Sequence, residues 1–271
     1  MKQNSKKWKR WLTWILSIYL LGGVGLYYLQ DILLFHPVKL GQYHAYAFTE
    51  AHREINIPIS QQATMNVVCF TSTAAVTKGV VLYFHGNKNN IGWYARYAPY
   101  FTKHGYELWM MDYPGFGKST GSLDEQTLYS WALQLYKMAR SRYAADSIII
   151  YGKSMGTGIA AQLASVRDCK RLILETPYYS LSSLAQHYFF IYPVRWMLHY
   201  KMPTGNYLQK VTAPVTIFHG TADRLIPWSN AARLKARLKP GDAFISIDGG
   251  GHNNLFDFSQ TTTRLDSLLS Q

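Results

Sequence analysis

A serine between two glycines is the residue of this chain whose setting points most clearly to chemistry. Residues 152–156 are Gly-Lys-Ser-Met-Gly, directly after the apolar run 148–151 and before a segment rich in alanine and glycine. Where a strand turns sharply into a helix, the residue at the turn is held strained and exposed, and glycines two residues to either side leave room for the turn. The short pattern recurs by chance, but between a strand and a helix it predicts that Ser154 is a nucleophile.

A nucleophilic serine needs a base to accept its proton and a carboxylate to orient that base. Of the nine histidines, only His252 follows the last predicted strand and precedes the last predicted helix. Two carboxylates compete for the role of the acid: Asp223 follows the penultimate strand, and Glu175 follows the strand before it. We favour Asp223, because the loop after the penultimate strand is the usual place of the acid when the chain order is serine, acid, histidine.

Acyl transfer by a serine also needs backbone donors that stabilise the oxyanion of the tetrahedral intermediate. The predicted strand 80–84 runs into His-Gly-Asn at 85–87, and a glycine-containing turn at this place presents a backbone N–H group. The predicted donors are the N–H groups of Asn87 and of Met155, the residue after the serine. The turn by itself could equally be an ordinary polar connection, and its occurrence together with the serine motif favours the oxyanion role.

Two segments, one of which is the serine motif itself, resemble a phosphate-binding P-loop without matching it. Residues 115–119 and the serine motif itself both contain Gly-Lys-Ser or a close variant, but Asp112 and Ser147 stand where the first glycine of that loop is required. No group of histidine and carboxylate residues has metal-ligand spacing, and the two cysteines, Cys69 and Cys169, form no CxxC pair. The sequence therefore predicts neither a nucleotide site nor a metal site, and it leaves open whether the cysteines pair.

The elements that position these residues follow an alternating order. Two strands with polar outer faces open the domain, and short apolar runs separated by helix-length segments come after them. Near-continuous apolar strands between helices are typical of a mostly parallel sheet covered by helices on both faces, which predicts an α/β fold. The predicted strands are 53–59, 66–71, 80–84, 106–111, 147–151, 172–174, 215–218 and 243–247.

Composition narrows the class of protein. The chain has 271 residues, of which 48% are hydrophobic, enough to exclude a disordered chain. The formal net charge of +13 could suggest a nucleic-acid partner, but five of the basic residues lie in the first ten positions and the others form no basic run. We therefore expect no nucleic-acid binding.

The N-terminus has the pattern of a membrane anchor. Residues 11–30 carry no charged side chain, and about twenty helical residues rise about 30 Å, enough to cross the hydrocarbon core of a bilayer. A buried core helix and a cleavable signal peptide are the alternatives, the latter because Gly-Val-Gly at 23–25 offers small residues to a peptidase. We favour an uncleaved anchor, because the run is longer than a signal peptide requires and lacks a typical cleavage site.

The charge around this segment predicts its orientation. Basic residues precede the segment, which places the N-terminus in the cytoplasm and the rest of the chain on the periplasmic or luminal side. We therefore expect a basic cytoplasmic tail at 1–10, a transmembrane signal anchor at 11–30, and one extracytoplasmic α/β domain at 38–271.

These motifs together resemble the α/β-hydrolase superfamily, over roughly residue 38 to the C-terminus. In family order, the chain has HGN ending at Asn87, DYPGFGKS from Asp112, GKSMG around Ser154, HGTAD ending at Asp223 and GGGH ending at His252. The basic N-terminus, the single anchor and FHP at 35–37 are similar to the membrane-anchored α/β-hydrolase-domain proteins. The resemblance implies an α/β-hydrolase fold and acyl chemistry without a cofactor.

The resemblance leaves the substrate open. Relatives in that branch act as esterases, as acylglycerol or lysophospholipid lipases, and as thioesterases that remove acyl groups from proteins, while related sequences also carry peptidase labels. One fold and one triad serve many substrates, so ester, thioester and amide substrates all remain candidates.

The segment from about 177 to 211 lies between the sixth and seventh strands of the sheet, where this fold carries its cap. It is rich in aromatic residues and contains no acidic residue. A basic, aromatic lid near a bilayer suits lipid contact, although the same rings could simply pack the cap onto the sheet. The residues that we expect in a substrate lid are Phe189, Phe190 and Trp196.

The sequence therefore predicts a serine hydrolase of lipid-like acyl esters, with a small-molecule ester or lipid as its partner and membrane attachment through the N-terminal helix. A serine peptidase or amidase of the same fold is one alternative. A membrane-bound binding protein without catalysis is another, and the presence of every triad and oxyanion position argues against it. The sequence has no recognisable signal for a protein partner.

Overall fold

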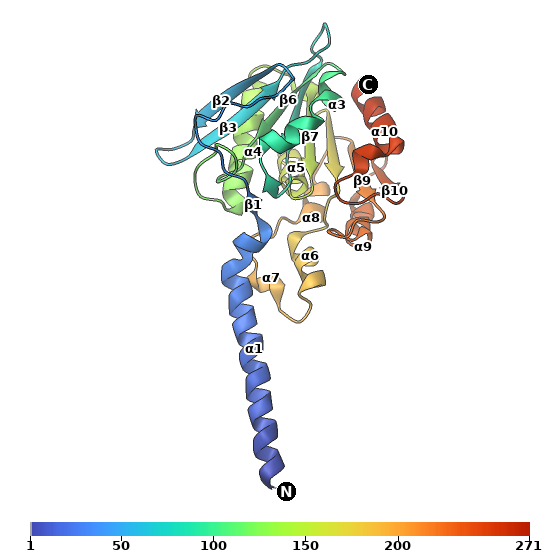
Figure 1. Ribbon diagram of the computed structural model, residues 1–271. Coiled ribbons are helices and arrows are strands. Elements are labelled where there is room, and N and C mark those ends of the chain that lie inside the picture. Colours follow the sequence, from blue (N-terminus) through green and yellow to red (C-terminus); the bar gives the residue numbers. More distant parts are fainter. Residues whose placement is uncertain (1) are drawn as a thin grey trace.

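A sheet of eight strands forms the centre of the computed structural model, which describes residues 2–271 and side chains from Lys7 onward (Figure 1). Met1 and the side chains of Lys2 and Lys6, all in the predicted basic tail, lie outside the described residues. The strand order is β10-β9-β8-β7-β4-β6-β3-β2, parallel from β10 to β6 and antiparallel where β3 meets β6 and β2. The predicted mostly parallel sheet is confirmed. The strands are β2 (His52–Pro58), β3 (Thr64–Phe70), β4 (Gly79–Phe84), β6 (Tyr106–Met111), β7 (Ile148–Lys153), β8 (Arg171–Glu175), β9 (Val215–Gly220) and β10 (Ala243–Ile247).

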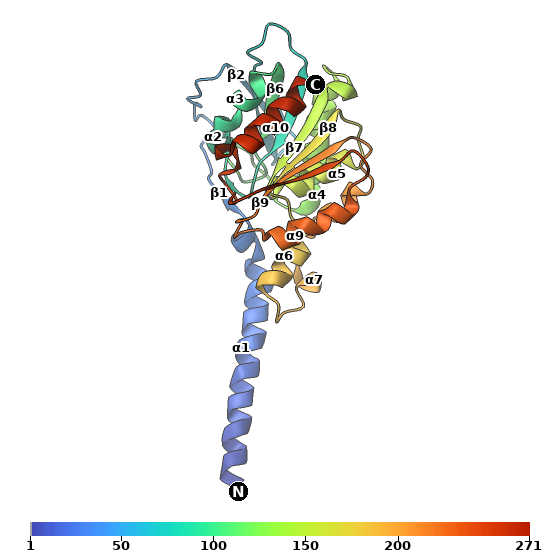
Figure 2. The ribbon, with the colours of Figure 1, turned by 90° about the vertical axis from the view of Figure 1, so that its right-hand side faces the viewer.

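Helices cover both faces of this sheet, as Figure 2 shows from the side. One face packs against α4, α5 and α8, and the other against α2, α3 and α10. The helices of the domain are α2 (Ile91–Tyr94), α3 (Pro99–Thr102), α4 (Glu125–Arg140), α5 (Gly156–Ala164), α6 (Leu181–Tyr188), α7 (Val194–Met197), α8 (Thr204–Leu208), α9 (Trp228–Ala232) and α10 (Ser259–Ser270).

The central strand β4 shows why these apolar runs form a doubly covered sheet. Successive side chains of a strand point to opposite faces. Val80, Leu82 and Phe84 join the apolar cluster on one face, while Val81 and Tyr83 join the cluster on the other, and all of them are buried. A strand with this sequence is therefore stable only when helices cover both of its faces.

The helix α1 (Lys2–Leu34) projects from one end of the domain (Figure 1). Its segment from Lys7 to Leu34 is long and apolar enough to cross a membrane, and its most apolar part is not buried in the protein. That exposure argues against a buried core helix. After α1 the chain forms the short strand β1 (His36–Pro37), which pairs in parallel with β5 (Lys88–Asn89).

The segment between β8 and β9 carries α6, α7 and α8. Figures 1 and 2 both show α6 and α7 beside the half of α1 that is nearer to the sheet. Below, the segment 177–211 is called the cap. The cap and the end of α1 thus meet at the edge of the sheet where the parallel strands end.

Candidate active site

Ser154 lies in the tight turn between β7 and α5. Its backbone φ is 52°, in the left-handed region that residues with a side chain rarely adopt. A Cβ atom at Gly156 would overlap the carbonyl oxygen of Phe84, and one at Gly152 would lie 2.6 Å from the carbonyl oxygen of Gly156. The two glycines therefore let β4, β7 and α5 pack closely enough to hold the serine in this strained position.

The structure brings Ser154, His252 and Asp223 together from three different strand ends. The Oγ atom of Ser154 lies 2.9 Å from Nε2 of His252, which follows β10. The Nδ1 atom of the same ring lies 2.8 Å from Oδ2 of Asp223, which follows β9. This chain of hydrogen bonds can move a proton from the serine hydroxyl to the imidazole while the carboxylate holds the ring in place.

The carboxylate of Asp223 is buried but well supplied with donors. Its Oδ1 atom accepts the backbone N–H groups of Leu225, at 2.9 Å, and of Ile226, at 2.8 Å. Burial by itself would raise the pKa of this carboxyl group, but the hydrogen bond and charge of His252 and the N–H of Ile226 outweigh it and lower the pKa below its usual value. Asp223 is therefore ionised at neutral pH, as orientation of the base requires.

A second histidine, His219, lies close to this carboxylate without reaching the serine. Its Nε2 atom is 2.9 Å from the carbonyl oxygen of Ile226 and 3.7 Å from Oδ2 of Asp223. The ring is fully buried at the end of β9, and burial lowers its pKa. We therefore assign His219 a structural role, in which its neutral ring donates to the carbonyl group and fixes the loop that carries Asp223.

Glu175, the competing candidate for the acid, is engaged elsewhere. Its carboxylate forms an ion pair with Lys153, and its Oε2 atom accepts the hydroxyl proton of Tyr151 at 2.7 Å. Lys153 and Glu175 are each 1% exposed, and the Lys153 ammonium group also lies 3.4 Å from the carbonyl oxygen of His252. This geometry favours Asp223 as the acid.

The Lys153–Glu175 pair was not predicted from the sequence. The available signal was a lysine at the last position of an otherwise apolar strand, inside the serine motif. A charge in such a place requires a partner, because burial of an unpaired ammonium group is costly. Through the contact of the Lys153 ammonium group with the carbonyl oxygen of His252, the pair supports the loop that carries His252.

The predicted oxyanion donors lie on two sides of the serine. Asn87 follows β4 and Met155 follows Ser154, and both line the same cavity as the serine hydroxyl. Within residues 2–271, neither backbone N–H group has a hydrogen-bond acceptor in the protein. Both groups are therefore available to a substrate oxygen.

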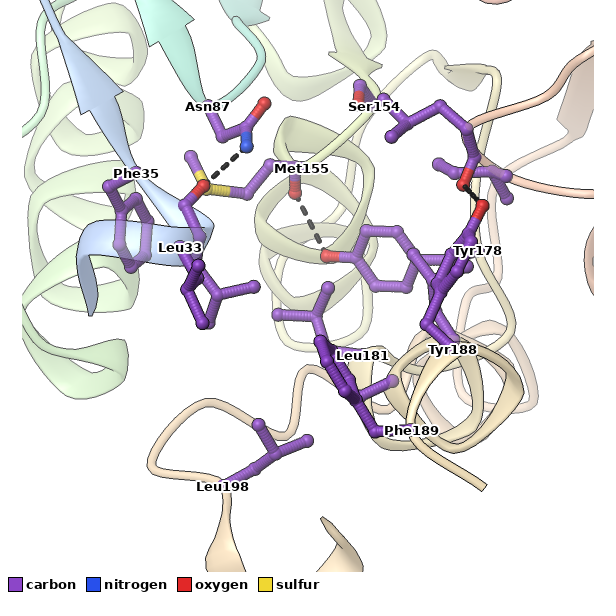
Figure 3. A pocket seen from close by; sticks show the side chains of 15 residues that line it. Leu33, Phe35, Asn87, Ser154, Met155, Tyr178, Leu181, Tyr188, Phe189 and Leu198 are labelled. Carbon is purple, nitrogen blue, oxygen red and sulfur yellow. Dashed lines mark hydrogen bonds between the residues drawn. The ribbon is translucent and has the colours of Figure 1, made fainter. Parts of the chain in front are cut away.

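The end of α1 holds the turn that carries Asn87. The side-chain amide of Asn87 donates to the carbonyl oxygen of Leu34, the last residue of α1 (Figure 3). The backbone N–H of His36 in turn donates to the carbonyl oxygen of Asn87 at 2.8 Å. The FHP segment at 35–37 thus connects the membrane-span candidate directly to Asn87, the predicted oxyanion donor.

An apolar cavity of about 200 Å³ opens over Ser154. Figure 3 shows its walls: the end of α1 on one side and α6 of the cap on the other, with Tyr178 donating its hydroxyl proton to the carbonyl oxygen of Met155 at 3.0 Å. Besides Ser154, Asn87 and Met155, the lining consists of Leu33, Leu34, Phe35, Tyr178, Leu181, Leu184, Ala185, Tyr188, Phe189, Leu198, Leu225 and Ile226. The cavity suits an acyl chain whose carbonyl carbon lies at the serine.

The expected lid residues have different positions. Phe189 lines the cavity, as expected. Phe190 and Trp196 do not, since the chain reverses after Phe189 and leaves these side chains 76% and 88% exposed. Of the three expected lid residues, only Phe189 therefore lies at the cavity in this structure, beside the apolar face of α6.

Other reactive groups lie away from this cavity. Cys69 in β3 and Cys169, before β8, are both free thiols. Among the described residues, no three His, Cys, Asp or Glu side chains gather in a way that could hold a metal ion.

Known proteins resemble this chain in sequence. Residues 75–207 match the family described as Serine aminopeptidase, S33 (Hydrolase_4). The chain is 29% identical to Alpha/beta hydrolase domain-containing protein 17C of Xenopus tropicalis over 204 residues, which cover 74% of this chain and 64% of the relative. It is 28% identical to protein 17B of Homo sapiens over 205 residues, which cover 74% of this chain and 70% of the relative. The chain thus spans slightly less than two thirds of the length of the 17C relatives.

Solved structures resemble it in fold. An esterase of Pyrococcus furiosus superposes with a TM-score of 0.67 at 15% identity, over 87% of this chain and 97% of the esterase. An alpha/beta hydrolase from Penicillium sp. sh18 superposes with a TM-score of 0.66 at 12% identity, over 81% of this chain and 98% of that chain. At these identities the superpositions establish the fold and leave the substrate to the residues of the site.

Proposed function

We propose that this chain, which has the α/β-hydrolase fold and resembles the alpha/beta hydrolase domain-containing proteins, is a serine hydrolase that cleaves lipid-like acyl esters. The observation that carries this proposal is the hydrogen-bonded series Ser154–His252–Asp223 at the inner end of an apolar cavity. Each group has the partner that its role requires, and the cavity places apolar surface beside the nucleophile.

The reaction proceeds in two halves. The Oγ atom of Ser154 attacks the acyl carbonyl carbon while His252 takes the hydroxyl proton, and the N–H groups of Asn87 and Met155 stabilise the oxyanion. The intermediate collapses to an acyl-serine as His252 protonates the departing alcohol or thiol. A water molecule, deprotonated by His252, then attacks the acyl-serine, and the carboxylic acid leaves as the proton returns to Ser154.

The lining of the cavity favours an acyl chain over a peptide amino terminus. An aminopeptidase substrate carries an ammonium group, which requires a carboxylate at a fixed place in the site. Among the described residues that line the cavity there is no aspartate or glutamate, and the polar side chains are Asn87, Ser154, Tyr178 and Tyr188. The matched family description does name an aminopeptidase, so amide hydrolysis is the second candidate.

A chain-length series tests the substrate class. Each buried methylene contributes about 0.8 kcal/mol, so kcat/KM should rise about fourfold per methylene of the acyl chain until the cavity is full. Phe189→Ala removes part of the wall and should flatten this rise, whereas Tyr43→Ala, at a fully exposed aromatic residue between β1 and β2, should leave the slope unchanged. If acetate esters are the best substrates and peptide amides are cleaved at comparable rates, a peptidase assignment replaces this one.

The same proposal includes a membrane location. It assigns residues 1–10 to a cytoplasmic tail, 11–30 to a single-pass anchor, and 38–271 to an extracytoplasmic hydrolase domain with its cap at 177–211. Two features support it: α1 projects from the domain and its most apolar part is not buried, and basic residues precede the apolar segment.

A reporter fusion tests this topology. A reporter that is active only in the cytoplasm, fused to the C-terminus, should be silent in cells that express the full chain. Strong reporter activity contradicts the orientation. Release of a shorter soluble form contradicts an uncleaved anchor.

A further inference from the structure

The cap contacts α1 far along the helix. The rings of Tyr19 and Tyr192 stack at a centroid distance of 4.8 Å. The Tyr19 hydroxyl donates to the carbonyl oxygen of Ile191 at 3.0 Å, and the Tyr192 hydroxyl donates to the carbonyl oxygen of Tyr19 at 3.2 Å. Nearer the sheet, Gln30 donates to the carbonyl oxygen of Met197 and accepts the N–H of His199. The cap therefore follows α1 from residue 30 back to residue 19, about 16 Å at the rise of an α-helix.

This contact has a consequence for any membrane that α1 crosses. The uncharged segment 11–30 matches a hydrocarbon core of about 30 Å, and Tyr19 lies near its middle. Because Tyr192 is hydrogen-bonded to Tyr19, the part of the cap around Tyr192, here called the cap tip, lies at the same depth as the middle of the span. In a membrane that residues 11–30 span, the part of the cap around Tyr192 would thus lie within the leaflet on the side of the hydrolase domain.

The surface of the cap tip agrees with a lipid environment. Phe190, Ile191 and Trp196 are all well exposed, an arrangement that is unfavourable in water. No aspartate, glutamate, lysine or arginine occurs from residue 176 to residue 194. Arg195, the first charge, lines a polar groove with Lys201 and Arg233, where its long side chain can reach the headgroup region.

Two apolar cavities lie next to each other between the cap and α1, and one of them contains Ser154. A second small apolar cavity lies between Leu26 and Gln30 of α1 and Val194 and Met197 of the cap. It shares part of its wall with the cavity over Ser154. The shared residues are Leu33, Leu34, Ala185, Phe189 and Leu198. The two cavities therefore adjoin, and their linings together extend along α1 from the depth of Leu26 to the nucleophile.

We infer that the cap inserts into the leaflet on the domain side, and that the acyl chain of a bilayer-resident ester reaches Ser154 laterally, between α1 and the cap, without passing through water. The access route rests on the proposed function, because it ends at Ser154 as the nucleophile. Insertion of the cap does not rest on it, so the two parts need separate measurements.

Quenching by brominated lipids tests the insertion. The full chain is placed in phosphatidylcholine vesicles in a Cys169→Ala background, in which the remaining Cys69 is buried. An environment-sensitive fluorophore is attached to a cysteine introduced by Phe190→Cys or, as the matched control, by Val76→Cys, an exposed site before β4 at the opposite edge of the sheet. Lipids brominated on the acyl chains should quench the label at position 190 several-fold more than at position 76. Equal quenching at the two positions overturns the insertion.

Labelling of Ser154 by fluorophosphonates tests the route. A long-chain alkyl fluorophosphonate dissolved in the vesicles is compared with a short-chain, water-soluble one. Leu26→Trp narrows the path far from the serine, and Leu29→Trp, at an exposed position of α1 that lines neither cavity, is the control. The ratio of long-chain to short-chain labelling rates should fall about tenfold in Leu26→Trp, the equivalent of about two methylene contacts, and stay at the wild-type value in Leu29→Trp.

An unchanged ratio in Leu26→Trp, or an equal fall in both variants, overturns the lateral route. Absence of labelling in the wild-type protein overturns the proposed function and with it the route to Ser154. In that case the brominated-lipid measurement still decides whether the cap is inserted.

Discussion

Ser154→Ala is expected to abolish fluorophosphonate labelling and to lower ester turnover by at least about 10⁴-fold. The Oγ atom of Ser154 is the only protein atom that forms a bond to the acyl group in the proposed mechanism, and its proton has an acceptor in His252 at 2.9 Å. Removal of this atom leaves the oxyanion donors and the cavity in place, so the residual rate measures what binding and the two N–H groups contribute without a covalent intermediate.

Ser165→Ala is the matched control, because this serine lies at the C-terminal end of α5, the helix that Ser154 precedes. It should keep both labelling and turnover, and thermal unfolding should show that both variants are folded. Turnover near the wild-type value in Ser154→Ala would mean that another residue is the nucleophile.

The sequence could predict most of this site because its chemistry lies immediately after strands. The apolar runs before Ser154, Asp223 and His252 are short, rich in β-branched residues and visible in a single sequence. Parallel strands end at the same edge of a sheet, so residues that follow them meet even when about a hundred positions separate them. In the structure, β9 and β10 end directly before the loops that carry Asp223 and His252.

Contacts between distant elements were not predictable from such local patterns. Phe189 and Phe190 are neighbours with the same side chain, and only the packing of the cap against α1 directs one into the cavity and leaves the other exposed. The hydrogen bond between the Asn87 side chain and the carbonyl oxygen of Leu34 was not predictable either, because it joins residues that lie far apart in the sequence. Periodicity specifies which residues are apolar, while the partner of each apolar surface depends on the tertiary fold.

Glu175 illustrates a further limit of prediction from the sequence. Strand position placed both Glu175 and Asp223 at the edge of the sheet where the serine lies, but it does not specify where a carboxylate points. In the structure, the buried ammonium group of Lys153 forms an ion pair with the carboxylate of Glu175, which favours Asp223 as the acid. Experiment can therefore distinguish the two carboxylates, because loss of the catalytic acid should lower activity, whereas loss of the partner of Lys153 should lower stability.

Asp223→Asn is expected to lower kcat/KM by about 10⁴-fold with little loss of stability. The carboxylate of Asp223 accepts a hydrogen bond from Nδ1 of His252 and stabilises the imidazolium ion that forms when Ser154 gives up its proton. An asparagine amide of the same size keeps the bonds to the loop. However, it carries no charge, and it can present an N–H group to Nδ1, which favours the wrong tautomer of the base.

Glu175→Gln is the comparison that separates the two carboxylates, and its main effect is expected on folding. It leaves the ammonium group of Lys153 buried without a counter-charge, which costs about 3–5 kcal/mol in the free energy of unfolding. Since Lys153 also contacts the carbonyl oxygen of His252, some activity is lost as well, but far less than in Asp223→Asn when both are assayed well below their melting temperatures. Urea denaturation of both variants measures the loss of stability, and kcat/KM of both variants measures the loss of activity. If Glu175→Gln proves the more severe loss of activity while its stability is unchanged, the acid is Glu175, and Asp223 only fixes the loop before α9.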